Sequence, residues 1–251
     1  MKIVLIGGSG RIGKQLATLL RRGGQDVTAA SPSSGVDAVT GAGLAEALHR
    51  AEVVVDVSNA PAFGDEAVLR FFQTSTRNLL AAESEAGVRH HVALTIVGAD
   101  RLTDSGYLRA KVAQESLIEA GPVPYTIVRA TQFFEFLMAV AQAGTQGRTV
   151  RVPSALMQPV AAADVAAFLA EVAVQPARNG RREVGGPQAL PIDQLLRRVL
   201  RAHGDAREVI ADADARYFGA RLAQDSLTAG AQAHIGITSL DDWLAAEAVA
   251  H

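Results

Sequence analysis

Glycines gather near the start of the chain, directly after the apolar run at residues 3–6. The segment fits both G-x-G-x-x-G and G-x-x-G-x-x-G, and apolar residues at helical spacing follow it. Glycines at these places let a strand-to-helix turn approach a pyrophosphate, and the N–H groups at the helix start attract its phosphates. We therefore expect a dinucleotide-binding loop made of Gly7, Gly8, Ser9, Gly10, Arg11, Ile12 and Gly13.

The end of the second predicted strand bears on which dinucleotide this loop would hold. NAD-binding chains of this type carry an acid about 20 residues after the loop, where it bonds the adenosine ribose. Here residues 31–34 read S-P-S-S, and no acid occurs before Asp37. A carboxylate would repel a 2′-phosphate, whereas hydroxyls donate to it and an arginine supplies positive charge. We therefore expect Ser31, Ser33 and Arg11 to favour NADP, with NAD as the alternative.

A tyrosine and a lysine stand four residues apart, at Tyr107 and Lys111. They lie in a predicted helix, on which residues i and i+4 share a face. An ammonium beside a phenol favours the phenolate and lowers the pKa of the phenol. Such a pair can move a proton near neutral pH, while the lysine also holds the nicotinamide ribose. Three tyrosines and three lysines give nine pairs, so the spacing alone is only suggestive.

These candidate residues belong to a chain in which strands and helices alternate. Apolar residues at helical spacing predict helices between the strands. Such alternation specifies a parallel sheet with helices on both faces, because each crossover must return over the sheet. We therefore expect an α/β fold, a doubly wound parallel Rossmann sheet. Its strands are predicted at residues 3–6, 26–30, 53–57, 91–97 and 125–128.

The alternation loosens in the second half of the chain. We expect residues 1–130 to form the dinucleotide-binding core, with a returning element at about 159–185. Residues 131–158 and 186–251 are expected to form a small, mostly helical region that binds substrate or acts as a lid. Its later helices are predicted at 192–202, 211–220 and 239–249.

Together these motifs resemble the short-chain dehydrogenase/reductase superfamily, and within it the atypical, NmrA-like NAD(P)-binding branch. The resemblance covers most of the chain. The residues that carry it are Gly7, Gly10 and Gly13, Asn59 after the third strand, Tyr107 with Lys111, the run Pro124-Tyr125-Thr126-Ile127-Val128-Arg129-Ala130 with Gln132-Phe133, and Asp164-Val165-Ala166.

The resemblance implies roles for individual residues. It makes Tyr107 the catalytic acid/base, Lys111 its partner, and Asn59 part of the cofactor site. It also implies a hydroxyl that polarises the substrate carbonyl, usually a serine about a dozen residues before the tyrosine. The match here is Thr95, which donates the same bond but is stiffer at χ1. The chain departs from the family pattern at Ile6, where a threonine often precedes the first loop glycine. Some members of the branch resemble enzymes but act as nucleotide-sensing regulators.

Composition limits the partners and the location. The chain has 251 residues and a net charge of −2, and binding nucleic acid through its phosphates usually takes a basic excess. It has no cysteine, and none of its six histidines has a partner at metal-ligand spacing. No apolar run is long enough for a membrane span or a secretory signal. We expect a cytoplasmic monomer or homodimer that binds a small molecule and no metal, nucleic acid or membrane.

The expected function is that of an NAD(P)-dependent oxidoreductase, in which NADPH reduces a carbonyl or quinone-like small molecule. In this interpretation Tyr107 donates the proton, Lys111 tunes it and Thr95 orients the acceptor. Two alternatives remain open. One is a non-catalytic, NAD(P)-sensing regulatory protein that binds a protein partner, and the other is an epimerase or dehydratase that uses bound NAD.

Overall fold

The computed structural model describes residues 1–62 and 64–250, which form two compact units. Unit 1 comprises Met1–Thr95, Gly106–Arg129 and Val165–Arg182, and unit 2 comprises Ile96–Ser105, Ala130–Asp164 and Glu183–His251. Phe63 and His251 lie outside the described residues. That the first unit holds a cofactor and the second a substrate stays a prediction.

A seven-stranded sheet with the order β12-β9-β5-β4-β3-β1-β2 confirms the predicted doubly wound α/β fold. The pairs β1–β2, β1–β3 and β3–β4 are parallel. The strand order reverses at β1, because β2 lies on one side of it and β3 on the other. Open sheets of this kind bind ligands at such a reversal, beyond the carboxyl ends of the strands. The strands are β1 Lys2–Ile6, β2 Asp26–Ala30, β3 Val53–Asp56, β4 His90–Ile96, β5 Tyr125–Ala130, β9 Gly180–Gly185 and β12 His234–Ile235.

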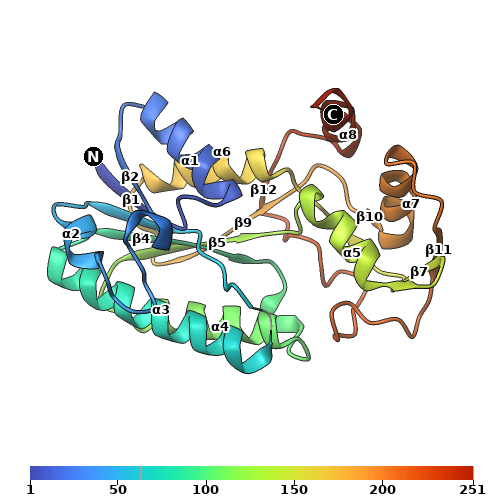
Figure 1. Ribbon diagram of the computed structural model, residues 1–251, viewed down its shortest axis with the longest axis horizontal. Helices are drawn as coiled ribbons and strands as arrows, with labels where there is room; N and C mark the ends of the chain where they lie inside the picture. Colours follow the sequence, from blue (N-terminus) through green and yellow to red (C-terminus); the bar gives the residue numbers. More distant parts are fainter. Residues whose placement is uncertain (63, 251) are drawn as a thin grey trace. The chain divides into compact units, whose positions relative to one another are not determined.

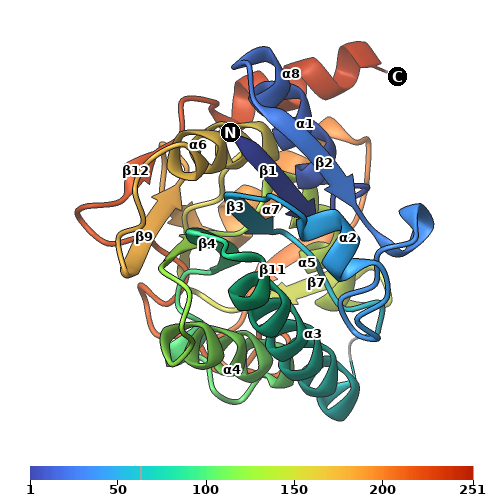
Figure 2. The ribbon, with the colours of Figure 1, turned by 90° about the vertical axis from the view of Figure 1, so that its left-hand side faces the viewer.

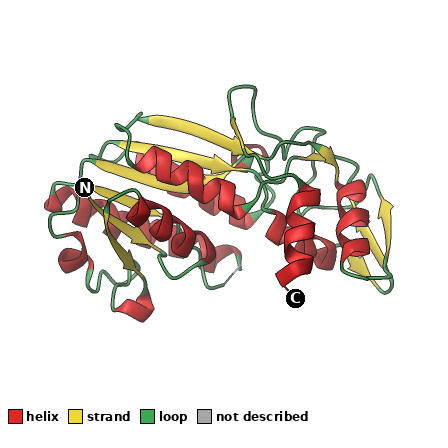
Figure 3. Cartoon of the chain, turned by 90° about the horizontal axis from the view of Figure 1, so that it is seen from above, coloured by secondary structure: helices red, strands yellow, loops and turns green. Residues whose placement is uncertain are grey.

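Helices cover both faces of this sheet (Figures 1 and 2). One face carries α1 Arg11–Arg22 and α6 Ala162–Ala173, which Figure 3 shows from above. The other carries α2 Leu44–Leu48, α3 Asp65–Ala86 and α4 Gly106–Glu119. Because both faces are covered, β1 is apolar after Lys2, and Ile3, Val4 and Leu5 are fully buried.

Unit 2 combines helices with short strands. Its helices are α5 Leu137–Ala143, α7 Ile192–Ala202 and α8 Leu240–Ala250, and β7 Thr149–Val152 pairs with β6 Thr145–Gln146 and β11 Glu208–Ala211. A further pair joins β8 Leu156–Met157 to β10 Leu190–Pro191. Short 3₁₀ helices occur at Pro32–Ser34, Ala99–Arg101 and Phe134–Phe136 of the chain. No helix among the described residues is long and apolar enough to cross a membrane.

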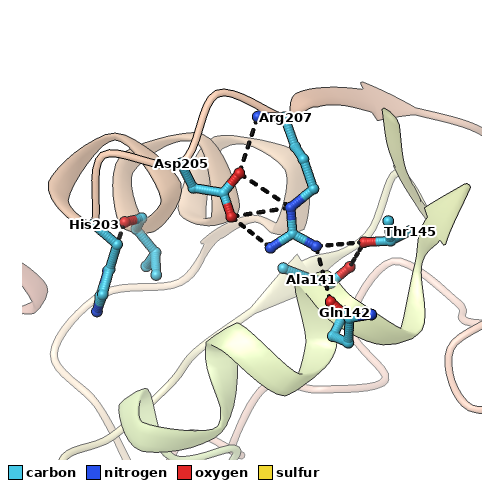
Figure 4. A network of polar contacts seen from close by, with 7 residues as sticks. Ala141, Gln142, Thr145, His203, Asp205 and Arg207 are labelled. Atoms are coloured by element: carbon cyan, nitrogen blue, oxygen red, sulfur yellow. Dashed lines mark hydrogen bonds and ion pairs between the residues drawn. The ribbon is translucent and has the colours of Figure 1, made fainter. Parts of the chain in front are cut away.

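Two contacts tie unit 2 together internally. The ring of Trp243 in α8 packs on Phe134, with 5.6 Å between the ring centroids. The Arg207 guanidinium, which precedes β11, bonds both oxygens of Asp205 and donates to the Thr145 hydroxyl at 2.7 Å (Figure 4). It also donates to Gln142 of α5 at 3.1 Å, so one side chain joins three segments.

The predicted helix at 211–220 is wrong. Glu208–Ala211 is the strand β11, and turns follow it. The Asp212 carboxylate accepts a bond from the Asp214 N–H at 2.9 Å, and Tyr217 and Ala220 exchange two backbone bonds. Aspartate side chains that bond nearby backbone groups compete with helix formation, which outweighs the apolar spacing that suggested a helix.

Two adjacent histidines on β4 point to opposite faces of the sheet, as their alternation predicts. The His90 ring lies 2.8 Å from the Thr126 hydroxyl, and the His91 ring lies 2.8 Å from the Glu83 carboxylate. Burial lowers the pKa of His90 to about 4. Burial alone would also lower the pKa of His91, but the charge and the hydrogen bond of Glu83, together with the charge of Asp56, outweigh it and raise that pKa.

Replacing His90 with glutamine should make the protein less sensitive to acid. Between about pH 6.5 and pH 4 the unfolded chain binds a proton at His90 that the folded chain does not, so the wild type loses stability as pH falls. The loss is at most about 3.5 kcal/mol, from roughly 1.4 kcal/mol for each pKa unit. Urea unfolding of the wild type and His90→Gln at several pH values measures it. Equal losses in the two proteins would contradict this assignment.

Candidate functional site

The glycine loop joins β1 to α1 and has the geometry that the sequence predicts. Gly7 has φ +83°, a conformation that disfavours other residues, and a Cβ there would lie 2.8 Å from the Ser58 backbone nitrogen. A Cβ on Gly13 would collide with the carbonyl oxygen of Gly7. Gly13 therefore lets α1 pack closely on the loop, which is the role expected of the third glycine.

The start of α1 suits a bound anion. Gly10 is the residue before the helix, and it provides no side-chain cap for the free N–H groups. The first turn contains no acid and begins with the exposed Arg11. A Cβ built on Gly10 meets only the Gly7 carbonyl oxygen, at 3.2 Å, so the space in front of the helix is open. The backbone donors, the helix dipole and the open approach fit the pyrophosphate of a dinucleotide.

The segment after β2 is a serine-rich turn. The Ser31 and Ser33 hydroxyls lie 2.9 Å apart, and the Ser34 hydroxyl accepts a bond from the Ser31 N–H at 2.9 Å. Ser31 is buried, whereas Ser33 is exposed. Both Gly7 and Gly8 donate their N–H groups to the Ala30 carbonyl at 3.0 Å, so this turn begins beside the glycine loop.

Tyr107 meets another predicted site residue, Asn59. The Tyr107 hydroxyl donates to the Asn59 side-chain oxygen at 2.9 Å, although the two residues were predicted for different roles. The Tyr107 ring also makes an edge contact with Phe72 of α3, with centroids 6.1 Å apart. Burial raises the pKa of Tyr107 to about 12. The phenol is therefore protonated at neutral pH, and the pKa shift is opposite to the lowering that a nearby ammonium was expected to cause.

Lys111 lies in the interior of unit 1. Its side-chain ammonium donates to the Leu94 carbonyl at 2.9 Å and to the Gln114 side-chain oxygen, and it lies 4.3 Å from the centre of the Phe72 ring. Phe72 therefore contacts both Lys111 and Tyr107, which agrees with their sharing one helix face. Burial lowers the pKa of Lys111 to about 8. Its predicted contact with a cofactor ribose stays a prediction.

Thr95 faces α4, and its hydroxyl is engaged there. It donates to the buried carboxylate of Glu115 at 2.6 Å. The same carboxylate accepts bonds from the Arg129 guanidinium of β5, one of them at 2.9 Å. The structure thus brings Tyr107 and Asn59 together and joins Lys111 to them through Phe72, while Thr95 belongs to a separate buried ion-pair group.

Three polar residues around this site were not singled out from the sequence. Asp56 is an acid at the end of an apolar strand, and Gln114 and Glu115 follow Lys111 by three and four residues. A buried strand rarely contains a carboxylate without a partner, and residues three and four apart share a helix face. These two sequence patterns could have identified Asp56, Gln114 and Glu115 as candidate site residues.

The NAD(P)H-binding family matches residues 7–176, a range that begins at the glycine loop and includes Tyr107 and Lys111. No curated protein sequence is significantly similar to the chain.

Solved structures share the fold at low sequence identity. A short-chain dehydrogenase/reductase superfamily protein from Agrobacterium tumefaciens with bound NAD has a TM-score of 0.75 and 17% identity, over 100% of this chain and 97% of that one. The dTDP-4-dehydrorhamnose reductase of Bacillus anthracis in complex with NADP has a TM-score of 0.68 and 14% identity, over 95% and 91%. The UDP-glucose 4-epimerase of Thermus thermophilus in complex with NAD has a TM-score of 0.68 and 17% identity, over 99% of this chain and 93% of that one.

The family match and the shared fold agree with the resemblance drawn from the motifs. The match covers more than half of the chain and includes the glycine loop. The protein therefore belongs to the NAD(P)H-binding family.

Proposed function

We propose that the protein is an NADPH-dependent oxidoreductase that reduces a carbonyl or quinone-like small molecule. The observation that carries the proposal is the protonated Tyr107 phenol, bonded to Asn59 in the same unit as the dinucleotide loop. Reduction of a carbonyl needs a proton donor for the oxygen on which negative charge develops. A phenol with a pKa of about 12 holds its proton at neutral pH and is still more acidic than an alcohol.

The residues that would hold the cofactor follow from the loop geometry. The N–H groups at the start of α1 and the glycines at 7, 10 and 13 would hold the pyrophosphate. Ser31, Ser33 and the Arg11 guanidinium would receive the 2′-phosphate. Asn59 follows β3, the strand next to β1, and would contact the nicotinamide half.

The chemistry then divides between the cofactor and the chain. The reduced nicotinamide, when bound, supplies a hydride to the carbonyl carbon. Tyr107 donates its hydroxyl proton to the carbonyl oxygen, so the substrate gains one hydride and one proton and becomes an alcohol. Asn59 accepts a hydrogen bond from the Tyr107 hydroxyl at 2.9 Å and holds the phenol in place. A phenol has one O–H donor, so this O–H turns from Asn59 to the carbonyl oxygen when the proton is donated. Lys111 stays the proposed source of positive charge near the phenolate that this step leaves.

A specific observation favours the alternative of a non-catalytic sensor. Thr95 and Lys111, two of the three groups predicted for catalysis, are bonded to protein partners in the interior. A protein that binds NAD(P) and transmits its redox state to a partner needs the loop but not a free hydroxyl at Thr95. Both functions share the cofactor site, so turnover is what separates them.

A substrate panel tests the proposal. Purified protein is mixed with NADPH and a range of aldehydes, ketones and quinones, and the loss of NADPH is followed. At least one acceptor should consume NADPH well above the rate without protein. Tight NADPH binding with no turnover on the whole panel would favour the sensor. Bound NAD that co-purifies and is never consumed would favour the epimerase or dehydratase.

Replacing Arg11 with alanine should weaken NADPH binding and leave NADH binding nearly unchanged. The exposed guanidinium can donate to a 2′-phosphate, which only NADPH carries, and such a charge-assisted bond contributes about 1.5–3 kcal/mol. We expect the Kd for NADPH to rise about tenfold or more, as measured by calorimetry for both nucleotides. Arg22, the exposed residue at the other end of α1, provides the matched control Arg22→Ala. Equal losses for NADPH and NADH, or a wild type that prefers NADH, would contradict the NADP preference.

A further inference from the structure

The Lys111 ammonium is enclosed by protein partners. It is 3% exposed, and it donates to the Leu94 carbonyl of β4 and to the Gln114 side-chain oxygen of its own helix. Its third side is turned to the Phe72 ring of α3, 4.3 Å from the ring centre. An ammonium has three N–H donors, so two hydrogen bonds and one aromatic face account for all of them.

The orientation of the Gln114 amide is determined by its second partner. Its nitrogen donates to the Asp56 carboxylate at 3.0 Å, and both side chains are buried. A carboxylate only accepts hydrogen bonds and an ammonium only donates them. The amide nitrogen must therefore face Asp56 and the amide oxygen must face Lys111, because the reverse orientation would break both bonds.

Asp56 connects this arrangement to the dinucleotide loop. It is the last residue of β3 and pairs in register with Ile6, the residue before Gly7. Its other oxygen accepts a bond from the Ser58 N–H at 2.9 Å, and a Cβ on Gly7 would lie 2.8 Å from that same nitrogen. A continuous polar chain thus leads from Ser58, beside the loop, through Asp56 and Gln114 to Lys111.

We propose that Gln114 and Asp56 are positioning residues, which hold the Lys111 ammonium beside Phe72 and Tyr107 in fixed relation to the dinucleotide loop. The proposal deepens the proposed function and rests on it for its catalytic meaning. Without Gln114 the ammonium would keep only the Leu94 carbonyl as an acceptor, and without Asp56 the Gln114 amide would be free to turn its nitrogen toward the ammonium.

The charges around Lys111 support this arrangement. Asp56 of β3 and Glu115 of α4 are the acids that favour its charged form, whereas α3 contributes the Phe72 ring and β4 the Leu94 carbonyl. Burial outweighs both acids and lowers the pKa of Lys111 to about 8. Glu115 is already paired with Arg129. The acid to which hydrogen bonds connect Lys111 is therefore Asp56, through the Gln114 amide.

The test is a direct titration of the lysines. The chain contains only Lys2, Lys14 and Lys111, so protein grown with ¹³C-labelled lysine gives three side-chain resonances to follow against pH. Gln114→Met keeps the length of the side chain and removes its hydrogen bonds to Lys111 and Asp56. In this variant the pKa of Lys111 should fall by about one unit, which is a tenfold rise in its proton dissociation constant. Asp56→Asn should lower it in the same direction. Lys2 and Lys14 should not move, and Ser116→Ala, at an exposed position of α4, should leave all three unchanged.

A second measurement links the lysine to the reaction. The kcat for NADPH-dependent reduction is measured against pH in the wild type and in Gln114→Met, and its inflection should move down with the pKa of Lys111, because the proposed role of the ammonium is to supply positive charge near the phenolate that Tyr107 becomes. If the protein binds no dinucleotide, the proposed function fails, but the lysine titration still decides the positioning. If Gln114→Met does not unfold cooperatively, Asp56→Asn decides in its place. The proposal is overturned if Lys111 titrates together with Lys2 and Lys14, or if its pKa does not change in the folded variants.

Discussion

Gly10→Asp is expected to raise the Kd for NAD(P)H by about 100-fold or more without unfolding the protein. Gly10 has φ −74° and precedes α1, a position at which aspartate is among the preferred residues because it caps the helix. Its carboxylate would stand where the pyrophosphate approaches. Two unit charges about 4 Å apart near a protein surface repel by about 4 kcal/mol, enough for the expected loss.

Gly10→Asn is the matched control for that change. Asparagine has nearly the same shape and also caps helices well, but it has no charge. The asparagine variant should bind NADPH more weakly than the wild type and clearly more tightly than the aspartate variant, by calorimetry. Similar affinity in the wild type and Gly10→Asp would place the dinucleotide elsewhere. Thermal unfolding of all three proteins shows whether the fold is retained.

Tyr107→Phe is expected to lower kcat for reduction by about 10²-fold, which is the usual contribution of a general acid. Phenylalanine keeps the ring and its edge contact with Phe72, and it removes only the hydroxyl that donates to Asn59. Cofactor affinity should therefore change little. The measurement is NADPH-dependent turnover of the acceptor found in the substrate panel.

Tyr125→Phe is the control for this tyrosine. Tyr125 lies at the amino end of β5, whereas ligands of such sheets bind beyond the carboxyl ends of the strands. The variant should retain full turnover. Activity that persists in Tyr107→Phe would move the proton donor to another group. In a protein that only senses NAD(P), the Tyr107 change would be silent because no acceptor would be reduced.

The fold could be predicted because its signals are local. The buried run of β1 is apolar at every position, and the spacing of Ile12, Leu16 and Leu20 places all three on the buried face of α1. The glycine loop was equally accessible, since the positive φ of Gly7 and the tight packing at Gly13 follow from a strand-to-helix turn.

The partners of the catalytic candidates could not be predicted in the same way. Thr95 and Glu115 are 20 residues apart, and Lys111 and the Leu94 carbonyl are 17 apart. Their contacts depend on how α4 packs against β4, and a helical or strand period does not contain that information. The spacing therefore placed Tyr107 and Lys111 on one helix face but left open whether their polar groups meet a ligand or the protein.

Transfer of deuterium from the cofactor tests the central claim, NADPH-dependent reduction, most directly. NADPH labelled with deuterium on one or the other face of nicotinamide C4 is incubated with the protein and an aldehyde or ketone acceptor from the panel, because a hydroquinone would exchange the label with water. The product is analysed by mass spectrometry. The account predicts that one labelled form delivers its deuterium to the carbon of the new alcohol and the other does not, at a rate that falls about 10²-fold in Tyr107→Phe. A product without deuterium from either form, or no product from any acceptor despite NADPH binding, would contradict it.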